Sequence, residues 1–436
     1  VSSNERRASA LQTEKTEQAY ISLLREELVP AQGCTEPIAL AFCAAKAREV
    51  LGCLPQKLRV HASGNIIKNV KGVIVPGTNG RKGIAAAAIF GAIGGDAGKE
   101  LEVLSDISPE NRSLAEQYLE QPGYCTVEHL KTDAKLHIIV EAFSGNDRAL
   151  AEIRDTHTNL IRLERNGAAL FKKACAEAIP EKPQTDYDFL SVEGILSFAE
   201  HVEISKIENI IERQIRYNTA ISNEGLLHTY GANVGKTLLE TADGNVWTQA
   251  RAAAAAGSDA RMSGSVLPVV INSGSGNQGI TVSMPVIVYA QHLGASRERL
   301  IRALAISNLV AIHQKSKVGR LSAYCGAVSA AAGSGAAIAW LDGASHELIE
   351  LTVSNTLANV SGILCDGAKP SCAAKIASAV EAALVGYSLA KKQRSFQPGD
   401  GIVKDGLEET ISAVGEIASK GMLQTDEEII RIMISE

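Results

Sequence analysis

Four cysteines lie in sequence contexts that suggest chemistry. Cys34 lies in "QGCTEP" and Cys325 in "AYCGAV", whereas Cys365 and Cys372 enclose the stretch "CDGAKPSC". All four have glycine nearby, and Cys34 and Cys372 lie where helices are expected to begin. A thiol at a helix N-terminus is acidified toward the thiolate, which is the form that binds metals. These cysteines are therefore candidate metal ligands.

The number and spacing of the cysteines limit the type of metal site. Eight cysteines among 436 residues are too scattered for the disulfide framework of a small secreted protein. The close C-x2-C pairs of structural zinc sites are absent from the sequence. Three or four distant thiolates around an iron–sulfur cluster are compatible with the spacing, although the spacing alone does not single out this cofactor.

Two glycine-containing stretches could bind a carboxylate or a phosphate. The first, "SGSGNQG", begins at residue 273 and offers backbone amides together with polar side chains. Its candidate binding residues are Ser273, Gly274, Ser275, Gly276, Asn277 and Gln278. The second, "SGNIIKN", begins at residue 63 and adds Ser63, Asn65 and Lys68. A tight turn between buried segments and a solvated loop at a strand end are the alternative interpretations of these two stretches.

The elements that must position these residues differ along the chain. A helix is predicted from "GCTEP", with Thr35 as its cap and Gly52 as its stop signal. Between about 56 and 165, "KLRVHAS", "GVIVPGT", "LHIIVEAF" and "NLIRLERNG" indicate strands of a sheet with one solvated face. Helical spacing dominates after a linker candidate at 179–188. There, an amphipathic helix is predicted to end at Cys365, and Pro370 to begin the next helix.

Composition narrows the function classes. The chain has 45% apolar residues, a net charge of −6 and an aromatic content of 4%. This composition does not indicate the basic surface with stacking aromatic residues that is typical of nucleic-acid-binding proteins. Two long uncharged stretches, 262–296 and 321–341, are dominated by Ala, Gly and Ser, which favours buried core helices over membrane spans. The first 19 residues are polar and lack an apolar signal core, so a reducing cytoplasm is the expected location.

Several motifs together resemble a known family. "GCTEP", "SGNIIKN", "GVIVPGT", "SGSGNQG", "GRLSAYCGAVSAAAGSG", "LCDGAKPSC" and "GDGIVKDG" resemble the bacterial and archaeal L-cysteine desulfidases and their relatives over nearly the whole chain. Residues 260–380 are more distantly similar to the α portion of iron–sulfur L-serine dehydratases. The resemblance implies a [4Fe-4S] cluster held by three cysteines, which leaves one iron open to the substrate.

The resemblance implies two different ligand sets. In the desulfidases the expected ligands match Cys34, Cys325 and Cys365. The serine dehydratase pattern instead favours Cys325, Cys365 and Cys372. We favour the first set, with Cys372 as the reserve ligand, because "GCTEP" combines a thiol with a helix start and is hard to explain by packing.

A domain arrangement follows from the first ligand set. Because Cys34 must reach Cys325 and Cys365, we expect residues 20–54 and 184–436 to form one helical domain with small-residue buried helices. Residues 55–183 would form an inserted α+β domain, after a polar N-terminal segment at 1–19. The fold class is therefore α+β, with the active site where the two domains meet.

The implied reaction is a non-redox β-elimination of L-cysteine to sulfide, ammonia and pyruvate. His157 in "DTHTNL" is the first candidate for the base, because an imidazole accepts protons near neutral pH. A surface-strand histidine is its alternative interpretation. Lys315 lies ten residues before Cys325 and could serve as the base if burial lowers its pKa.

The same residues are compatible with other functions. L-serine carries a comparable β-leaving group, so the same site could act as an L-serine dehydratase. A pyridoxal-phosphate β-eliminase would use "SGSGNQG" as a phosphate cradle and one lysine as the Schiff base. An amino-acid transporter would use the two uncharged stretches. The expected partner is a small amino acid, with neither nucleic acid nor membrane, and a homodimer is the default assembly.

Overall fold

A computed structural model describes residues 3–173, 187–319 and 322–434 of the chain. Its strands are β1 (Pro30–Gln32), β2 (Lys57–Ala62), β3 (Cys125–His129), β4 (His137–Ser144), β5 (Asp147–Arg154), β6 (Leu160–Arg165), β7 (Ala168–Lys172) and β8 (Pro268–Val270). The first group of helices is α1 (Ser3–Glu27), α2 (Thr35–Leu51), α3 (Gly64–Val70), α4 (Gly83–Gly94) and α5 (Pro109–Glu120). The second group is α6 (Val192–His201), α7 (Glu208–Leu227), α8 (Val234–Thr241), α9 (Val246–Met262), α10 (Gly276–His292), α11 (Arg297–Val318), α12 (Gly326–Leu341), α13 (His346–Val360), α14 (Cys372–Lys391), α15 (Leu407–Glu416) and α16 (Leu423–Ile434). The α+β class predicted from the sequence is confirmed.

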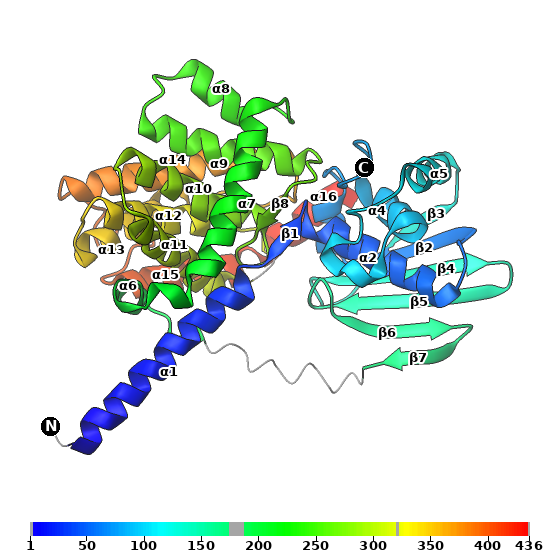
Figure 1. Ribbon diagram of the computed structural model, residues 1–436, viewed down its shortest axis with the longest axis horizontal. Coiled ribbons are helices and arrows are strands. Elements are labelled where there is room, and N and C mark those ends of the chain that lie inside the picture. The colour runs from blue at the N-terminus through cyan, green and yellow to red at the C-terminus, as the bar shows by residue number, and fades with distance from the viewer. Residues whose placement is uncertain (1–2, 174–186, 320–321, 435–436) are drawn as a thin grey trace.

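A mixed sheet forms one part of the molecule (Figure 1). Among the described residues its strand order is β3-β2-β4-β5-β6-β7, with β2 and β3 parallel and the other neighbours antiparallel. On β2 the buried side chains of Leu58, Val60 and Ala62 alternate with more exposed ones. The opposite face carries ion pairs such as Arg59–Glu141. The alternation of β2 follows its period of two, but β4 and β5 are mostly buried on both faces, so the sheet lacks a fully solvated face along its central strands.

Three of the four predicted strand segments form strands, and "GVIVPGT" does not. Its backbone makes an isolated bridge between Ile74 and Lys82 instead of a ladder. Pro76 has no N–H to donate, and Gly77 has a φ of +75°, so neither residue continues a strand. The linker candidate at 179–188 lies mostly outside the described residues.

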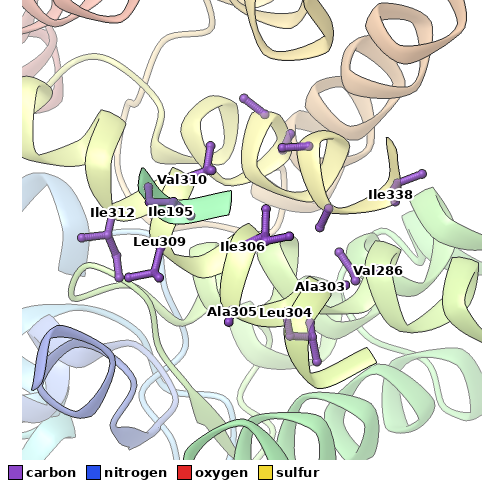
Figure 2. Packing of buried hydrophobic residues seen from close by; sticks show 14 of the residues in the cluster. Ile195, Val286, Ala303, Leu304, Ala305, Ile306, Leu309, Val310, Ile312 and Ile338 are labelled. Carbon is purple, nitrogen blue, oxygen red and sulfur yellow. The ribbon is translucent and has the colours of Figure 1, made fainter. Parts of the chain in front are cut away.

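A helical bundle forms the second part, and its core is built around α11. Figure 2 shows Ile306 and Leu309 of α11 packed between Ile195 of α6, Val286 of α10 and Ile338 of α12. A Cβ on Gly333 of α12 would lie 2.4 Å from a backbone oxygen of α11. Small residues therefore let these backbones approach closely, as the composition of the uncharged stretches predicts.

The uncharged stretches contribute α10 and α12, which are largely buried inside the bundle. In the described part of the chain one helix, α14, is long and apolar enough to cross a membrane by length and composition alone. Of its apolar window, 56% is buried against the rest of the protein. A core helix passes the same test, so this feature is weak evidence for a span.

Helix α2 lies on the sheet rather than in the bundle. Its buried side chains belong to the same hydrophobic cluster as β2, β4 and α4. The division of the chain at residue 55 stays a prediction about domains, but side-chain packing groups 35–51 with the sheet. The bundle and the sheet part are joined by β1, which pairs with β8, and by α16, which contacts α3 (Figure 1).

Three helix boundaries differ from the prediction, and one of them is the start of α14, which begins at Cys372 rather than at Pro370. Helix α2 begins at Thr35, so Cys34 is its N-cap and Gly52, in the left-handed conformation, is its C-cap. Helix α13 ends at Val360 instead of Cys365. The chain from 361 instead makes a backbone bridge between Leu364 and Tyr324. Hydrogen bonds to a distant segment therefore replace the last turn of the predicted helix.

Candidate active site

A cavity of about 270 Å³ lies where the sheet part meets the helical bundle. The sheet part contributes the start of α2, helix α3 and the loops at 135–136 and 155–157. The bundle contributes the end of α9, the turn before α10, the end of α11 and the starts of α12 and α14. Ligand sites commonly form at such junctions, as the sequence predicts for this chain.

The pairing of β1 with β8 brings two distant motifs together. Pro30 lies opposite Val270 in an antiparallel register. Cys34 therefore follows one strand at the point where the "SGSGNQG" turn follows the other. The Thr35 hydroxyl lies 3.4 Å from the Gly274 carbonyl oxygen, to which it donates a hydrogen bond. This short sheet is the physical reason that residues 34 and 274 line one cavity.

A second backbone contact places Cys325 beside Cys365. The bridge between Tyr324 and Leu364 is antiparallel. The Cys325 amide donates to the Ile363 carbonyl at 3.0 Å, and the Cys365 amide donates to the Ala323 carbonyl at 2.6 Å. Because side chains alternate along extended chain, both cysteines point to the same side of this bridge. Their electrostatic coupling agrees with this proximity.

Four helices begin at the cavity. Cys34 is the N-cap of α2, Cys325 is the N-cap of α12, and Cys372 is the first residue of α14. Helix α10 begins at Gly276, directly after Ser275, whose hydroxyl accepts from the Gln278 amide. Helix N-termini carry partial positive charge and unsatisfied N–H groups. The cavity is therefore suited to an anionic group.

The sequence predicts acidic thiols, and this prediction is wrong for the chain without a bound cation. Burial raises the pKa of Cys325 to about 12 and raises the pKa of Cys34 and Cys372 as well. The cost of desolvating a thiolate exceeds the benefit of the helix N-termini. A coordinated cation would offset this cost, because metals deprotonate the thiols that bind them.

The donor set fits a cluster in type and in location. Cys34, Cys325, Cys365 and Cys372 all line the cavity, and Cys34 packs in one small cluster with Cys372. Within the described residues, however, no group of three His, Cys, Asp or Glu side chains converges closely enough to hold a metal ion. Thiolate ligands and positive helix ends are what an anionic iron–sulfur cluster requires. The ligand roles of the four cysteines stay predictions.

The "SGSGNQG" turn lies at the cavity almost entirely as expected. Ser273, Gly274, Ser275, Asn277 and Gln278 line it. Ser273 adopts a φ of +49°, which is rare for a residue with a side chain and is typical of binding sites. Gly276 lies behind the lining, where a Cβ would meet the Arg261 side chain at 2.3 Å.

The "SGNIIKN" segment is divided between two cavities. Lys68 lines the site, but its ammonium group donates to Asp426 of α16 at 2.5 Å and to the Cys365 carbonyl at 3.4 Å. Ser63 and Asn65 line a neighbouring cavity beside α16 instead. The Ser63 hydroxyl donates to the Lys135 carbonyl at 2.7 Å, so it serves the local backbone. The structure therefore does not bring Ser63 and Asn65 to the predicted substrate site.

Both candidate bases line the cavity. His157 lies in the loop between β5 and β6 rather than on a surface strand, and it acts electrostatically on Glu36. Lys315, near the end of α11, is 5% exposed. Burial lowers the pKa of Lys315 to about 8, against the opposing effect of Cys365 and Cys325. Lys315 thus reaches the neutral form at a far lower pH than an exposed lysine does.

The sequence interpretation missed two charged residues of the site, Glu36 and Arg261. Glu36 accepts hydrogen bonds from the Cys34 thiol, the Thr35 hydroxyl and the Asn69 amide, each at 3.1 Å. Burial opposes its ionisation, but His157, Cys34 and Arg261 together lower the pKa of Glu36. Its position in "GCTEP", two residues after a candidate ligand, was a usable signal. Arg261 had no comparable signal.

Comparison with known proteins identifies the family of this chain. The model of the serine dehydratase alpha chain family matches residues 98–431. The chain belongs to this family. This membership supports, at a coarse level, a lyase of amino-acid catabolism, in a family that is generally iron–sulfur dependent.

Full-length relatives carry the name UPF0597 protein. The relative from Lachnoclostridium phytofermentans is 54% identical over 95% of this chain and 99% of its own length. The relative from Treponema denticola is 48% identical over 96% of this chain and 98% of its own. The relative from Actinobacillus pleuropneumoniae serotype 5b is 40% identical over 96% and 97%, respectively. The similarity to these UPF0597 proteins thus extends over both parts of the fold.

Proposed function

We propose that this protein catalyses the non-redox β-elimination of L-cysteine to sulfide, ammonia and pyruvate, in the cytoplasm and with a [4Fe-4S] cluster. The observation that carries the proposal is the meeting of four cysteines, a buried lysine and a polar glycine-rich turn in one cavity. Cys34, Cys325 and Cys365 would hold the cluster, with Cys372 in reserve. When bound, such a cluster supplies an iron with an open position that acts as a Lewis acid toward the β-thiolate of the substrate.

The protein's own residues would bind the substrate and move its α-proton. The turn at 273–278 offers the N–H groups of the first turn of α10 to the substrate carboxylate. A neutral lysine or histidine then accepts the proton from Cα as the Cβ–S bond breaks and sulfide leaves. The remaining aminoacrylate tautomerises and is hydrolysed to pyruvate and ammonia.

Lys315 is the stronger of the two candidate bases. It lines the same cavity as Cys325 and Cys365, and both cysteines act on it electrostatically. No ion pair or hydrogen bond of its ammonium group occurs within the described ranges, so this group is available to a substrate. His157 lies on the sheet side and its charge interacts with Glu36, which supports a role in fixing that carboxylate.

L-serine dehydration is the second candidate function, because the matching family model is that of a serine dehydratase alpha chain. The two reactions need the same base and the same carboxylate site and differ only in the leaving group. The buried surroundings of Cys325 and Lys315 are compatible with either substrate.

The test is anaerobic reconstitution of the full chain with iron and sulfide, followed by assays of both amino acids. We expect L-cysteine to give sulfide and pyruvate in equal amounts, with L-serine a poorer source of pyruvate. Faster pyruvate release from L-serine than from L-cysteine would assign the second function. Absence of pyruvate from both substrates in protein with a full cluster would refute the lyase.

A further inference from the structure

Arg261 is a buried cation in the cavity, and its charge helps to lower the pKa of Glu36 without a direct ion pair among the described residues. Its side chain, in the last turn of α9, is 2% exposed. One guanidinium nitrogen, Nη1, donates to the Asn277 side-chain oxygen at 3.1 Å. Nε has no hydrogen-bond partner, and no ion pair of Arg261 occurs in the described part of the chain. Buried guanidinium groups are normally paired with anions, because desolvating an uncompensated charge is costly.

The surroundings of Arg261 indicate where its missing anion binds. Arg261 lines the cavity together with Ser273, Ser275 and Asn277. A Cβ on Gly276 would lie 2.3 Å from Nε, so glycine at this position lets the guanidinium reach the first turn of α10. The Gln278 N–H of that turn is capped by the Ser275 hydroxyl, whereas the N–H groups of Gly276 and Asn277 have no acceptor within the helix. The buried guanidinium therefore lies beside a helix N-terminus with two uncapped backbone donors.

The shape of the donor group favours a carboxylate. A guanidinium fork matches the two oxygens of a carboxylate in a bidentate arrangement. Glu36 lies on the sheet side of the same cavity and does not form a bidentate pair with Arg261. Both of its carboxylate oxygens already accept hydrogen bonds, from Cys34, Thr35 and Asn69. The anion must therefore come from outside the described chain.

We infer that Arg261 binds the α-carboxylate of the substrate and makes a free carboxylate the requirement for recognition at this site. The inference rests on the proposed function and deepens it, because it names the residue that recognises the carboxylate of the substrate. Amides and decarboxylated amines with the same thiol would be excluded. They would leave the guanidinium desolvated and without an anion.

The experiment measures ligand affinity separately from turnover. Binding of L-cysteine, L-cysteinamide and cysteamine to the cluster-free and the cluster-loaded full chain is measured anaerobically by calorimetry. We expect the wild-type protein to bind L-cysteine roughly 10- to 100-fold more tightly than the two probes without a carboxylate. Arg261→Met should weaken L-cysteine binding by a similar factor and leave cysteamine binding unchanged.

Two further variants control for indirect effects. Arg251→Met removes an arginine from the same helix that pairs with Glu381 at 2.8 Å outside the cavity, and it should keep the wild-type preference. Arg261→Lys keeps the charge but loses the fork, so its preference should be intermediate. If Arg261→Met does not fold, as judged by circular dichroism, Arg261→Lys decides, because a carboxylate preference equal to that of the wild-type protein would overturn the role of the guanidinium fork.

The outcomes separate this inference from the proposed function. Equal affinity of the wild-type protein for L-cysteine and cysteamine, or an unchanged preference in Arg261→Met, would overturn the carboxylate role. Loss of iron in Arg261→Met with an unchanged preference would show that the arginine serves the cluster instead, which also overturns it. A strong carboxylate preference in a loaded protein that releases neither sulfide nor pyruvate would support Arg261 and refute the lyase. Failure of both protein forms to bind L-cysteine would refute the inference.

Discussion

Replacing Lys315 by methionine should stabilise this protein while it abolishes catalysis. The side chain is 5% exposed, and burial lowers its pKa from 10.5 to about 8. A difference of one pH unit corresponds to about 1.4 kcal/mol, so the buried ammonium costs the folded state about 3 kcal/mol at pH 7. Methionine matches the length of the lysine stem and carries no charge to desolvate. We therefore expect Lys315→Met to raise the free energy of unfolding by up to about 3 kcal/mol.

The stabilisation by Lys315→Met should decrease as the pH rises. Below pH 8 Lys315 is protonated in both the folded and the unfolded state, and the full cost is present. Between about 8 and 10.5 the unfolded state binds the proton and the folded state does not, so the wild-type protein gains stability as the pH rises. The advantage of Lys315→Met should therefore fall from about 3 kcal/mol at pH 7 to about 1.5 kcal/mol at pH 9.5.

The assay is urea unfolding of the cluster-free protein at pH 7 and pH 9.5, followed by circular dichroism and by fluorescence to test for a single transition. Lys317→Met is the matched control, because Lys317 lies on the same helix with a side chain that is 36% exposed. That control should change stability by no more than about 0.5 kcal/mol at either pH. A Lys315→Met variant that is less stable than wild type at pH 7, or an advantage that grows with pH, would refute the reasoning.

Three further predictions concern the ligands, an ion pair and the base. Each proposed ligand is changed to serine in turn: Cys34, Cys325, Cys365 and, in reserve, Cys372. Iron and sulfide analysis after anaerobic reconstitution should find the cluster lost in the first three variants and mostly retained in the fourth. If instead the Cys372 variant loses the cluster and the Cys34 variant keeps it, Cys372 is the third ligand. Asp426→Leu should lower the free energy of unfolding in urea by roughly 3 to 5 kcal/mol, because it leaves the 2% exposed Lys68 ammonium without its partner. The double variant with Lys68→Met should recover much of this loss. If the costs of the two single variants simply add in the double variant, the buried ion pair is contradicted. The kcat/KM for L-cysteine should rise with pH to a plateau above about 8, as Lys315 loses its proton, and a profile that falls over this range would exclude Lys315 as the base.

Local sequence determined the types of element and the chemistry of the site. Alternation along β2 and the stop signal of α2 at Gly52 follow from side-chain and backbone preferences over a few residues. The glycines around Cys325 and Cys365 and the polar turn at 273–278 marked the cavity for the same reason. These signals are local, so a single sequence is enough to read them.

Long-range pairing decided which of these residues meet. The β1–β8 ladder sets Cys34 beside Gly274, and the Tyr324–Leu364 bridge sets Cys325 beside Cys365. Neither contact involves more than a few residues, and both join segments far apart in the chain. Because the paired segments lie so far apart in the chain, no local periodicity in the sequence indicates that they meet.

Burial also decided charge states that the sequence could not determine. A cysteine at a helix start was expected to be acidic, yet burial raises the pKa of Cys34 and Cys325. Arg261 looks like any other helical arginine in the sequence, but the packing of α9 against α10 buries it without an anion. Desolvation depends on every atom packed around a group, and only the tertiary structure determines those neighbours.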